Sequence, residues 1–297
     1  MTTIQKQTNT SVQADDTTPE EIVELGRKYR SLGGAAKAKD PDALLKMGRY
    51  LLDQEKVEPE DIHALLFKSV SFADLPTIEA IKELGADITA YEEGQPLVFL
   101  AYENGNKKLA LDLIQKGHFS PNVGLADGET LILAALLRED FDFCQSLVDL
   151  GADVNYPMGL PQNRLLHYAA NNGSFTAIAW LIGVGADPLV RNFDEKLPSE
   201  MVPDNAQLPE EDRDQWDFDE MFNVLEAYAD AFEKGEAFEL PERFMDMVAK
   251  ENTAITQSEA LSQVAANQQK VEKVDEDDAQ ADDLLASIKP KTAKTGF

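Results

Sequence analysis

Apolar residues recur at three- and four-residue steps along most of the chain, the spacing of helices with one buried face. Between residues 64 and 199 this pattern comes in paired short stretches. The first stretch of each pair reads ALLFKSVSFAD, PLVFLAYENGN, TLILAALLRED or RLLHYAANNGS, starting at Ala64, Pro96, Thr130 and Arg164. The pattern predicts four helical hairpins in tandem, each opening at one of these residues.

A glycine follows the second helix of each predicted hairpin. Gly85, Gly117, Gly151 and Gly185 lie 32, 34 and 34 residues apart. Glycine readily adopts the left-handed conformation that ends a helix, which a β-branched residue resists. A constant period of this length is typical of a repeat array, in which each unit packs only on its neighbours.

These units resemble the ankyrin repeat over about residues 64–199. The best match is the unit from Arg164 to Asn192, in which Arg-Leu-Leu-His stands where the family has Thr-Pro-Leu-His. The unit from Ala64 matches least, and Leu197-Pro198-Ser199-Glu200 reads as the start of a fifth, broken unit. The resemblance implies an all-α, ankyrin-type helical solenoid. It also implies that His167 hydrogen-bonds backbone groups around the turn and has no catalytic role.

Helical caps are expected on both sides of the repeats, because an array must cover its end faces. Thr18-Pro19-Glu20-Glu21 is a helix-start signature, and this helix is expected to run to about Leu32 and stop at Gly33-Gly34. A second helix is expected from Asp40-Pro41. Near the other end, a one-sided helix and a shorter helix over 241–249 are expected. The one-sided helix would bury Phe218, Met221, Phe222, Leu225, Tyr228 and Phe232.

The chain is therefore expected to divide into five segments. They are a disordered N-terminus (1–17), an N-terminal helical cap (18–58), the repeats (59–202), an acidic loop with a C-terminal cap (203–250), and a mostly disordered acidic tail (251–297). In the tail, Leu284, Leu285 and Ile288 have helical spacing. They belong either to a solvated tail or to a docking segment that folds on a partner.

The charge balance restricts the class of partner. The chain has 27 basic and 55 acidic residues, a net charge of −28. Such a surface repels phosphate, which argues against nucleic acid and anionic membranes as direct partners. A basic protein would be attracted, although the charge is also explained by solubility alone. No stretch is apolar and long enough to cross a membrane, and a cytoplasmic location is expected.

Residues that could support catalysis are scarce. Phosphate loops, His-Glu-x-x-His motifs and paired cysteines are absent from the sequence. His63, His118 and His167 fall in different units, and Cys144 is expected to be buried in the second helix of the third unit. We therefore expect no enzyme activity, no cofactor and no metal site.

The resemblance also implies a binding surface, because ankyrin arrays bind through the tips of their turns and the exposed side of each first helix. The corresponding residues here are Tyr91, Glu92, Glu93, Gln95, Glu103, Asn104, Leu125, Ala126, Asp127, Glu129, Leu137, Arg138, Tyr156, Met158, Leu160, Pro161, Asn163, Asn171, Asn172, Phe193, Asp194 and Lys196. The turn from Asp153 to Asn163 departs from the family by two prolines and Met158. Its apolar residues are expected either to anchor a partner or to pack on a neighbouring turn.

The function expected from these features is non-catalytic binding of a protein partner by a chain that is monomeric alone, as an adaptor, scaffold or inhibitor. One narrower hypothesis is an inhibitor or immunity-type protein that neutralises a basic enzyme such as a nuclease or toxin. Another is an effector delivered into a second cell. Only charge and groove shape favour the former, while the latter rests on the resemblance and on a tail that could carry an export signal.

Overall fold

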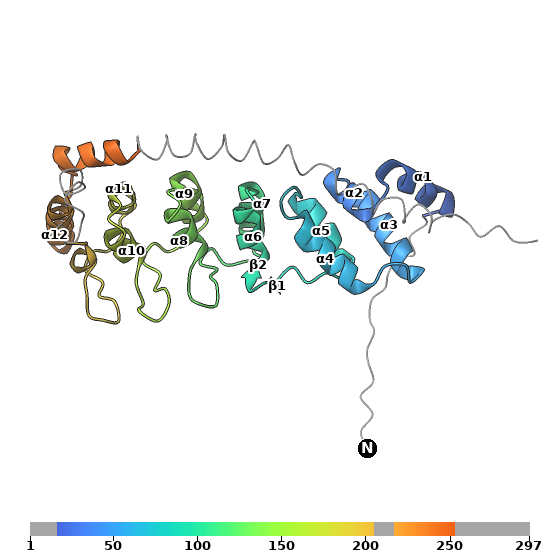
Figure 1. Cartoon of the computed structure of the whole chain (residues 1–297), viewed down its shortest axis with the longest axis horizontal. Coiled ribbons are helices and arrows are strands. Elements are labelled where there is room, and N and C mark those ends of the chain that lie inside the picture. Colours follow the sequence, from blue (N-terminus) through green and yellow to red (C-terminus); the bar gives the residue numbers. More distant parts are fainter. Residues whose placement is uncertain (1–16, 205–216, 253–297) are drawn as a thin grey trace, which may run out of the picture. The chain divides into compact units, whose positions relative to one another are not determined.

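The computed structural model describes residues 17–204 and 217–252, and most of them are helical (Figure 1). They form two compact units, residues 17–88 and residues 89–252. The all-α prediction is confirmed. In the described part of the chain, the strands are limited to the pair β1 (Tyr91–Glu92) and β2 (Gln95–Pro96).

The first unit contains five helices. They are α1 (Pro19–Tyr29), α2 (Leu32–Lys37), α3 (Pro41–Asp53), α4 (Pro59–Ser69) and α5 (Leu75–Glu83). Helix α3 packs against α1, α2 and α5, and α4 packs against α2 and α5. Leu44, Met47, Ile62 and Leu66 are fully buried where these helices meet. This core explains the apolar spacing of the segment.

The predicted end of the first helix was wrong. Helix α1 ends at Tyr29, and Gly33-Gly34 lies inside α2. The Ser31 side chain caps α2 by accepting the Gly34 N–H (3.0 Å). A Cβ atom on Gly34 would lie 1.9 Å from the Tyr29 carbonyl oxygen. Glycine is therefore present because two helix ends approach closely, and it does not end the helix.

The first predicted hairpin also begins earlier than expected. Helix α4 starts at Pro59, so Ala64 is in its interior. The start is set by a capping box, in which the Asp61 carboxylate accepts the Glu58 N–H (3.0 Å) and the Glu58 side chain caps the first turn. Comparison with the later units aligned Ala64 with helix starts, but this local capping signal determines the boundary.

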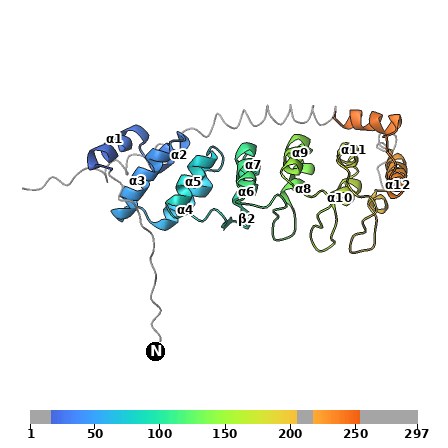
Figure 2. The ribbon, with the colours of Figure 1, turned by 180° about the vertical axis from the view of Figure 1, so that it is seen from behind.

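The second unit contains three successive helical hairpins. They are α6 (Leu97–Glu103) with α7 (Lys107–Gln115), α8 (Leu131–Leu136) with α9 (Phe141–Asp149), and α10 (Leu165–Asn171) with α11 (Phe175–Gly183). The pairs stand side by side, and the loops that join them project from one side (Figures 1 and 2). Gly117, Gly151 and Gly185, which follow the second helices, have φ of 80°, 96° and 79°. The predicted left-handed helix ends are confirmed.

Side-chain amides tie each hairpin to the next. The Asn122 Oδ1 accepts the Asp153 N–H (2.8 Å), and the Asn155 Oδ1 accepts the Asp187 N–H (2.9 Å). Each bond joins positions about one repeat apart. The asparagines therefore set the spacing of consecutive units, in addition to the apolar contacts between helices.

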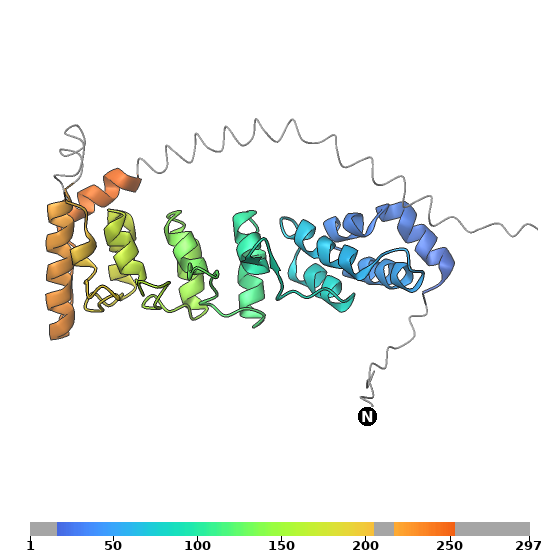
Figure 3. The same ribbon diagram turned by 60° about the horizontal axis from the view of Figure 1, so that its bottom comes forward.

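Three further elements follow the last hairpin. The predicted fifth unit is a single 3-10 turn, η1 (Ser199–Met201), followed by α12 (Phe218–Lys234) and a helix whose described residues are 242–252. Figure 3 shows this last helix across the ends of α11 and α12. Phe175 of α11 packs between Phe218 and Phe244, with ring centroids 6.4 and 5.2 Å apart.

The predicted buried face of α12 was too wide. Phe218, Met221, Leu225 and Tyr228 are buried, but Phe222 and Phe232 are 42% and 39% exposed. Tyr228 Oη donates to the Ala186 carbonyl oxygen (2.8 Å), which fixes the helix on the last repeat. The rotation set by this contact leaves the two other phenylalanines at the edge of the interface.

Candidate protein-binding surface

Loops of the second unit carry most of the residues predicted to bind a partner. The first is the β1–β2 turn, in which Glu93 and Gly94 both have positive φ (50° and 84°). This is the conformation of a tight hairpin turn. It leaves the side chains of Tyr91, Glu92 and Glu93 exposed.

Two apolar side chains project from neighbouring loop tips. Leu160 is 92% exposed and Phe193 is 71% exposed. The Phe193 N–H donates to the Pro161 carbonyl oxygen (2.7 Å), so the two tips are held together. Exposed apolar residues that are fixed side by side are typical of a docking point.

Met158 does not belong to this exposed surface, and its predicted place there was wrong. It is 1% exposed. Its Sδ accepts a hydrogen bond from the Thr130 hydroxyl (3.1 Å), and its N–H donates to the Asn163 carbonyl oxygen (2.9 Å). Gly128 allows the two tips to meet, because a Cβ atom on it would lie 2.3 Å from the Gly159 nitrogen. Met158 therefore packs on the neighbouring turn, which is the other reading that the sequence allowed.

An acidic cluster brings together predicted residues from one helix, α6, and two loops. The Glu103 carboxylate accepts a hydrogen bond from Arg138 (3.2 Å). Burial raises the pKa of Glu129, and the charge of Asp127 raises it further, while Arg138 opposes both. The carboxyl groups of Glu103 and Glu129 thus interact with one guanidinium group, and Asp127 adds a further negative charge beside Glu129. A cation from a partner would reduce their repulsion.

The remaining predicted residues differ in how much of their side chain faces solvent. Asn104, Ala126, Leu137, Tyr156, Pro161, Asn171, Asn172, Asp194 and Lys196 are exposed, and Gln95, Leu125 and Asn163 are partly buried. Asn163 has a structural contact, since its Oδ1 accepts from the Asn192 amide (2.8 Å). Leu284, Leu285 and Ile288 lie outside the described residues. For all these residues, binding stays a prediction.

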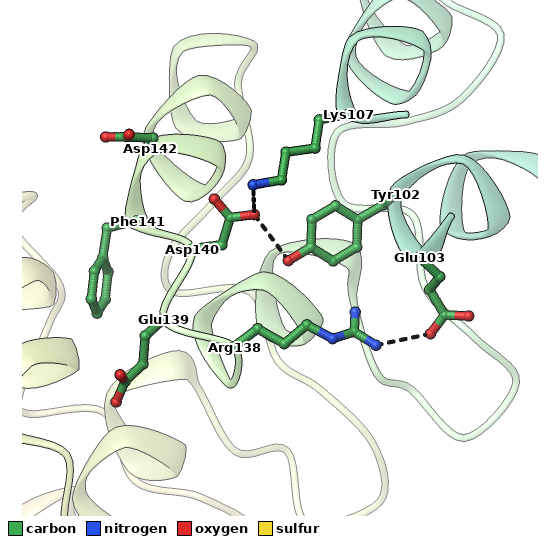
Figure 4. Close-up of a pocket in the computed structure, with 8 residues that line it drawn as sticks. All are labelled: Tyr102, Glu103, Lys107, Arg138, Glu139, Asp140, Phe141 and Asp142. Atoms are coloured by element: carbon green, nitrogen blue, oxygen red, sulfur yellow. Dashed lines mark hydrogen bonds and ion pairs between the residues drawn. The ribbon is translucent and has the colours of Figure 1, made fainter. Parts of the chain in front are cut away.

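A pocket of about 600 Å³ lies between the hairpins α6–α7 and α8–α9, at the turns that join the two helices of each hairpin (Figure 4). In it, the Asp140 carboxylate pairs with Lys107 (2.6 Å) and accepts from the Tyr102 hydroxyl (3.2 Å). Burial, followed by the charge of Asp140, raises the pKa of Tyr102. Its full lining is Tyr102, Glu103, Lys107, Arg138, Glu139, Asp140, Phe141 and Asp142. Apart from Glu103 and Arg138, sequence reasoning missed these residues, because it considered only the turn tips and first helices.

His167 has the structural role that the resemblance implied. It is fully buried. The Arg164 N–H donates to its Nδ1 (3.2 Å), and its Nε2 lies 3.1 Å from the Lys196 carbonyl oxygen. The ring is therefore neutral with the proton on Nε2, and burial lowers its pKa. It joins the start of α10 to the next loop.

Cys144 is buried, as predicted. Its thiol lies 3.8 Å from the Ile132 carbonyl oxygen, and burial raises its pKa to about 12. Within residues 17–204 and 217–252, no three His, Cys, Asp or Glu side chains are grouped so that they could hold a metal ion. None of the described helices is both long and apolar enough to cross a membrane.

Comparison with known proteins identifies the repeated hairpins. A family model described as ankyrin repeats (3 copies) matches residues 97–192. Two Arabidopsis thaliana proteins named as candidate E3 ubiquitin-protein ligases are similar to parts of the chain. XBAT35 is 40% identical over 78 residues, which are 26% of this chain and 17% of that protein. XBAT34 is 30% identical over 111 residues, which are 37% of this chain and 30% of that protein.

The matches therefore span less than a third of either plant protein. The unit made by α4 and α5 lies outside the residues matched by the family model, and its kinship to the repeats stays a prediction. The three hairpins from α6 to α11 coincide with the match. Residues 97–192 of this chain are therefore ankyrin repeats, which are non-catalytic modules for binding other proteins.

Proposed function

We propose that the second unit binds a protein partner. The part of the partner that it binds is a basic segment with an apolar side chain. The observation that carries this proposal is the acidic cluster of Glu103, Asp127, Glu129 and Arg138, in which carboxylates outnumber cations. A Lys or Arg side chain of the partner would relieve the repulsion that raises the pKa of Glu129.

The apolar part of the proposed partner follows from the neighbouring tips. Leu160 and Phe193 provide exposed apolar area, and the Phe193–Pro161 hydrogen bond fixes their separation before binding. A surface that is already ordered loses little conformational entropy on association. Charge would thus attract the partner, while the apolar pair would slow its dissociation.

The test is selection of binding peptides from a random library on the full-length chain, followed by affinity measurement on the best peptide. We expect enrichment of Lys or Arg together with an apolar residue. The double variant Asp127→Asn/Glu129→Gln should weaken binding about tenfold, equivalent to loss of about 1.4 kcal/mol. The control is Glu226→Gln/Glu233→Gln, which removes two exposed charges from α12. Equal effects of both variants, or affinity unchanged between about 0.05 and 0.3 M salt, would contradict the proposal.

A second candidate function is neutralisation of a basic enzyme, in which the same surface covers an active site. It is supported by the net charge of −28 as well as by the acidic cluster. A purified basic nuclease that forms a complex at low salt would be assayed for activity in that complex. Full activity of the bound enzyme would leave an adaptor role and exclude inhibition.

The plant relatives suggest a third candidate, recruitment of a protein to ubiquitin ligation. The chain has one cysteine and three histidines, too few for the paired four-ligand zinc sites of a RING module. Its part in such a reaction would therefore be recognition, carried by the ankyrin repeats. Ubiquitination of the partner that stays unchanged in the variant Asp127→Asn/Glu129→Gln, which weakens binding, would contradict this role.

A further inference from the structure

Two equivalent pockets exist in the repeats, one hairpin apart. The pocket of Figure 4 is lined by Tyr102, Glu103, Arg138 and Asp140, among others. A smaller pocket of about 160 Å³ is lined by Leu136, Leu137, Asn172 and Ser174, the residues 34 positions later. We call them the second–third slot and the third–fourth slot, after the predicted units that flank them. One slot thus lies at each of these two junctions.

The third–fourth slot is partly filled by the last described helix, residues 242–252, which we call the C-terminal helix, and its Glu251 lines the space that remains. The Glu251 carboxylate accepts the Thr176 N–H (2.6 Å) at the start of α11. It also lies within hydrogen-bonding reach of the Ser174 and Thr176 hydroxyls and of the Phe175 N–H. The Ser174 hydroxyl also donates to the Glu139 carboxylate (3.5 Å), which lines the same slot. Phe244 and Val248, on the same helix, are buried and hold it against the repeats.

The second–third slot has the opposite chemistry at the positions that contact Glu251. Ser174 is replaced by Asp140 and Thr176 by Asp142, at the start of α9. Glu139 and Glu103 also line this slot, so its lining includes four carboxylates and two cations, Lys107 and Arg138. Lys107 pairs with Asp140 and Arg138 pairs with Glu103. A carboxylate in this position would be repelled by the aspartates, while a Lys or Arg side chain would be attracted.

From the equivalence of the two slots, we propose that the second–third slot binds a Lys or Arg side chain of a helical segment from a protein partner. That segment would lie across the start of α9 as the C-terminal helix lies across the start of α11. The inference rests on the proposed function in taking a basic partner. The two sites share Glu103 and Arg138, and the slot adds Asp140 and Asp142 at the start of α9. Asp140 and Asp142 select the charge, and the pocket provides the volume for the side chain.

The first experiment is a titration of the isotope-labelled full-length chain with N-acetyl-arginine amide, followed by NMR. We expect the amide shifts of residues 138–142 to change at least threefold more than the mean of other exposed amides. The variant Asp142→Asn should reduce that change at least twofold. The control, Asp219→Asn, removes an exposed charge from the same position of another helix, the second residue of α12. Shifts spread evenly over acidic surfaces, or equal effects of the two variants, would overturn the proposal.

A second measurement keeps the inference testable if variants disturb the fold. The double variant Asp140→Ser/Asp142→Thr gives the second–third slot the residues of its partly filled counterpart. It should respond to N-acetyl-glutamate amide instead of the arginine probe, with far-ultraviolet circular dichroism confirming the fold. A folded double variant that still prefers arginine would overturn the proposal. The peptide selected on the full-length chain separates the two proposals. If it loses affinity in Asp127→Asn/Glu129→Gln but not in Asp140→Ser/Asp142→Thr, the proposed function stands and the slot is rejected.

Discussion

At the scale of single residues, the neutral state of His167 links folding to pH. Its ring accepts a hydrogen bond through Nδ1 and donates one through Nε2, and an imidazolium ion cannot accept. Its native pKa is lowered, so the unfolded chain binds a proton at a higher pH than the native chain does. Stability from this residue is therefore present above its unfolded pKa of about 6.5 and falls as the pH drops below it.

We predict that His167 makes the free energy of unfolding depend on pH, and that this contribution disappears when the residue is replaced. Replacing His167 by Ala should cost about 3 kcal/mol, because two buried backbone groups lose their partner. Between pH 7.5 and 5.5, wild type should lose up to about 1.4 kcal/mol per pH unit relative to the variant. Urea unfolding at each pH measures both quantities. Parallel pH profiles of the two proteins would contradict the neutral-ring assignment.

Cys144 provides a second residue-scale prediction. The thiolate is the reactive form of cysteine, and burial raises the pKa of this thiol to about 12. The native chain should therefore react with a disulfide reagent at pH 8 at least about a hundredfold more slowly than the denatured chain. Release of the coloured thiolate product measures the rates. Rapid reaction of the folded chain would show that the third repeat opens easily.

At the scale of elements, the close approach of two helix ends decides which of two adjacent glycines tolerates a larger side chain. A Cβ atom on Gly34 would overlap the Tyr29 carbonyl oxygen, whereas one on Gly33 would make ordinary contacts with the Ser31 Oγ at 3.7 Å and the Leu65 Cδ1 at 4.0 Å. We predict that Gly34→Ala destabilises the first unit by more than about 2 kcal/mol. Gly33→Ala should be neutral or stabilising by up to about 1 kcal/mol. Thermal unfolding of both variants tests this, and equal effects would contradict it.

The docking of the C-terminal helix depends on its buried face. Phe244 is fully buried against Phe175, while Met245, its neighbour, is 44% exposed. Phe244→Ala should remove about 3–5 kcal/mol of packing and detach the helix, because a cavity remains in the aromatic cluster. Hydrogen exchange of residues 242–252 and of the Thr176 amide would report this. Met245→Ala is the control, and unchanged exchange in Phe244→Ala would contradict the docking.

At the scale of the whole molecule, the net charge of −28 opposes compaction. Raising the salt concentration from about 0.01 to 0.1 M shortens the Debye length from about 30 to 10 Å. The midpoint of thermal unfolding should rise by about 2–4 °C, equivalent to roughly 1 kcal/mol. Measurement in sodium chloride and in choline chloride separates screening from ion binding. A midpoint that falls in both salts would contradict the prediction.

The repeats could be predicted from the sequence because their signals are local and occur several times. Gly117, Gly151 and Gly185 mark the same left-handed helix end, so each supports the reading of the others. His167 followed from the resemblance in the same way. The acidic cluster was predicted as separate residues, Glu103, Asp127, Glu129 and Arg138, but their mutual contacts depend on packing between units.

Met158, Gly34 and Glu251 show what a pattern of residues cannot supply. An exposed turn tip and a buried one have similar sequences, and the difference lies in a neighbouring turn that approaches at Gly128. Gly34 and Ala64 were misread because a close contact and a local cap override the general pattern. Glu251 reaches Thr176 across 75 positions of the chain, a distance at which no periodicity carries information.

The sequence by itself determined the helical hairpins, their period and their acidic character, because each depends on neighbouring residues or on simple counting. Tertiary structure alone decided which side chains share a site. It buried Met158, exposed Leu160 beside Phe193, and lined one inter-repeat slot with Glu251 while leaving four carboxylates around another. The physical reason is that burial and electrostatic interaction depend on distances in space, and folding brings together residues that the sequence keeps apart.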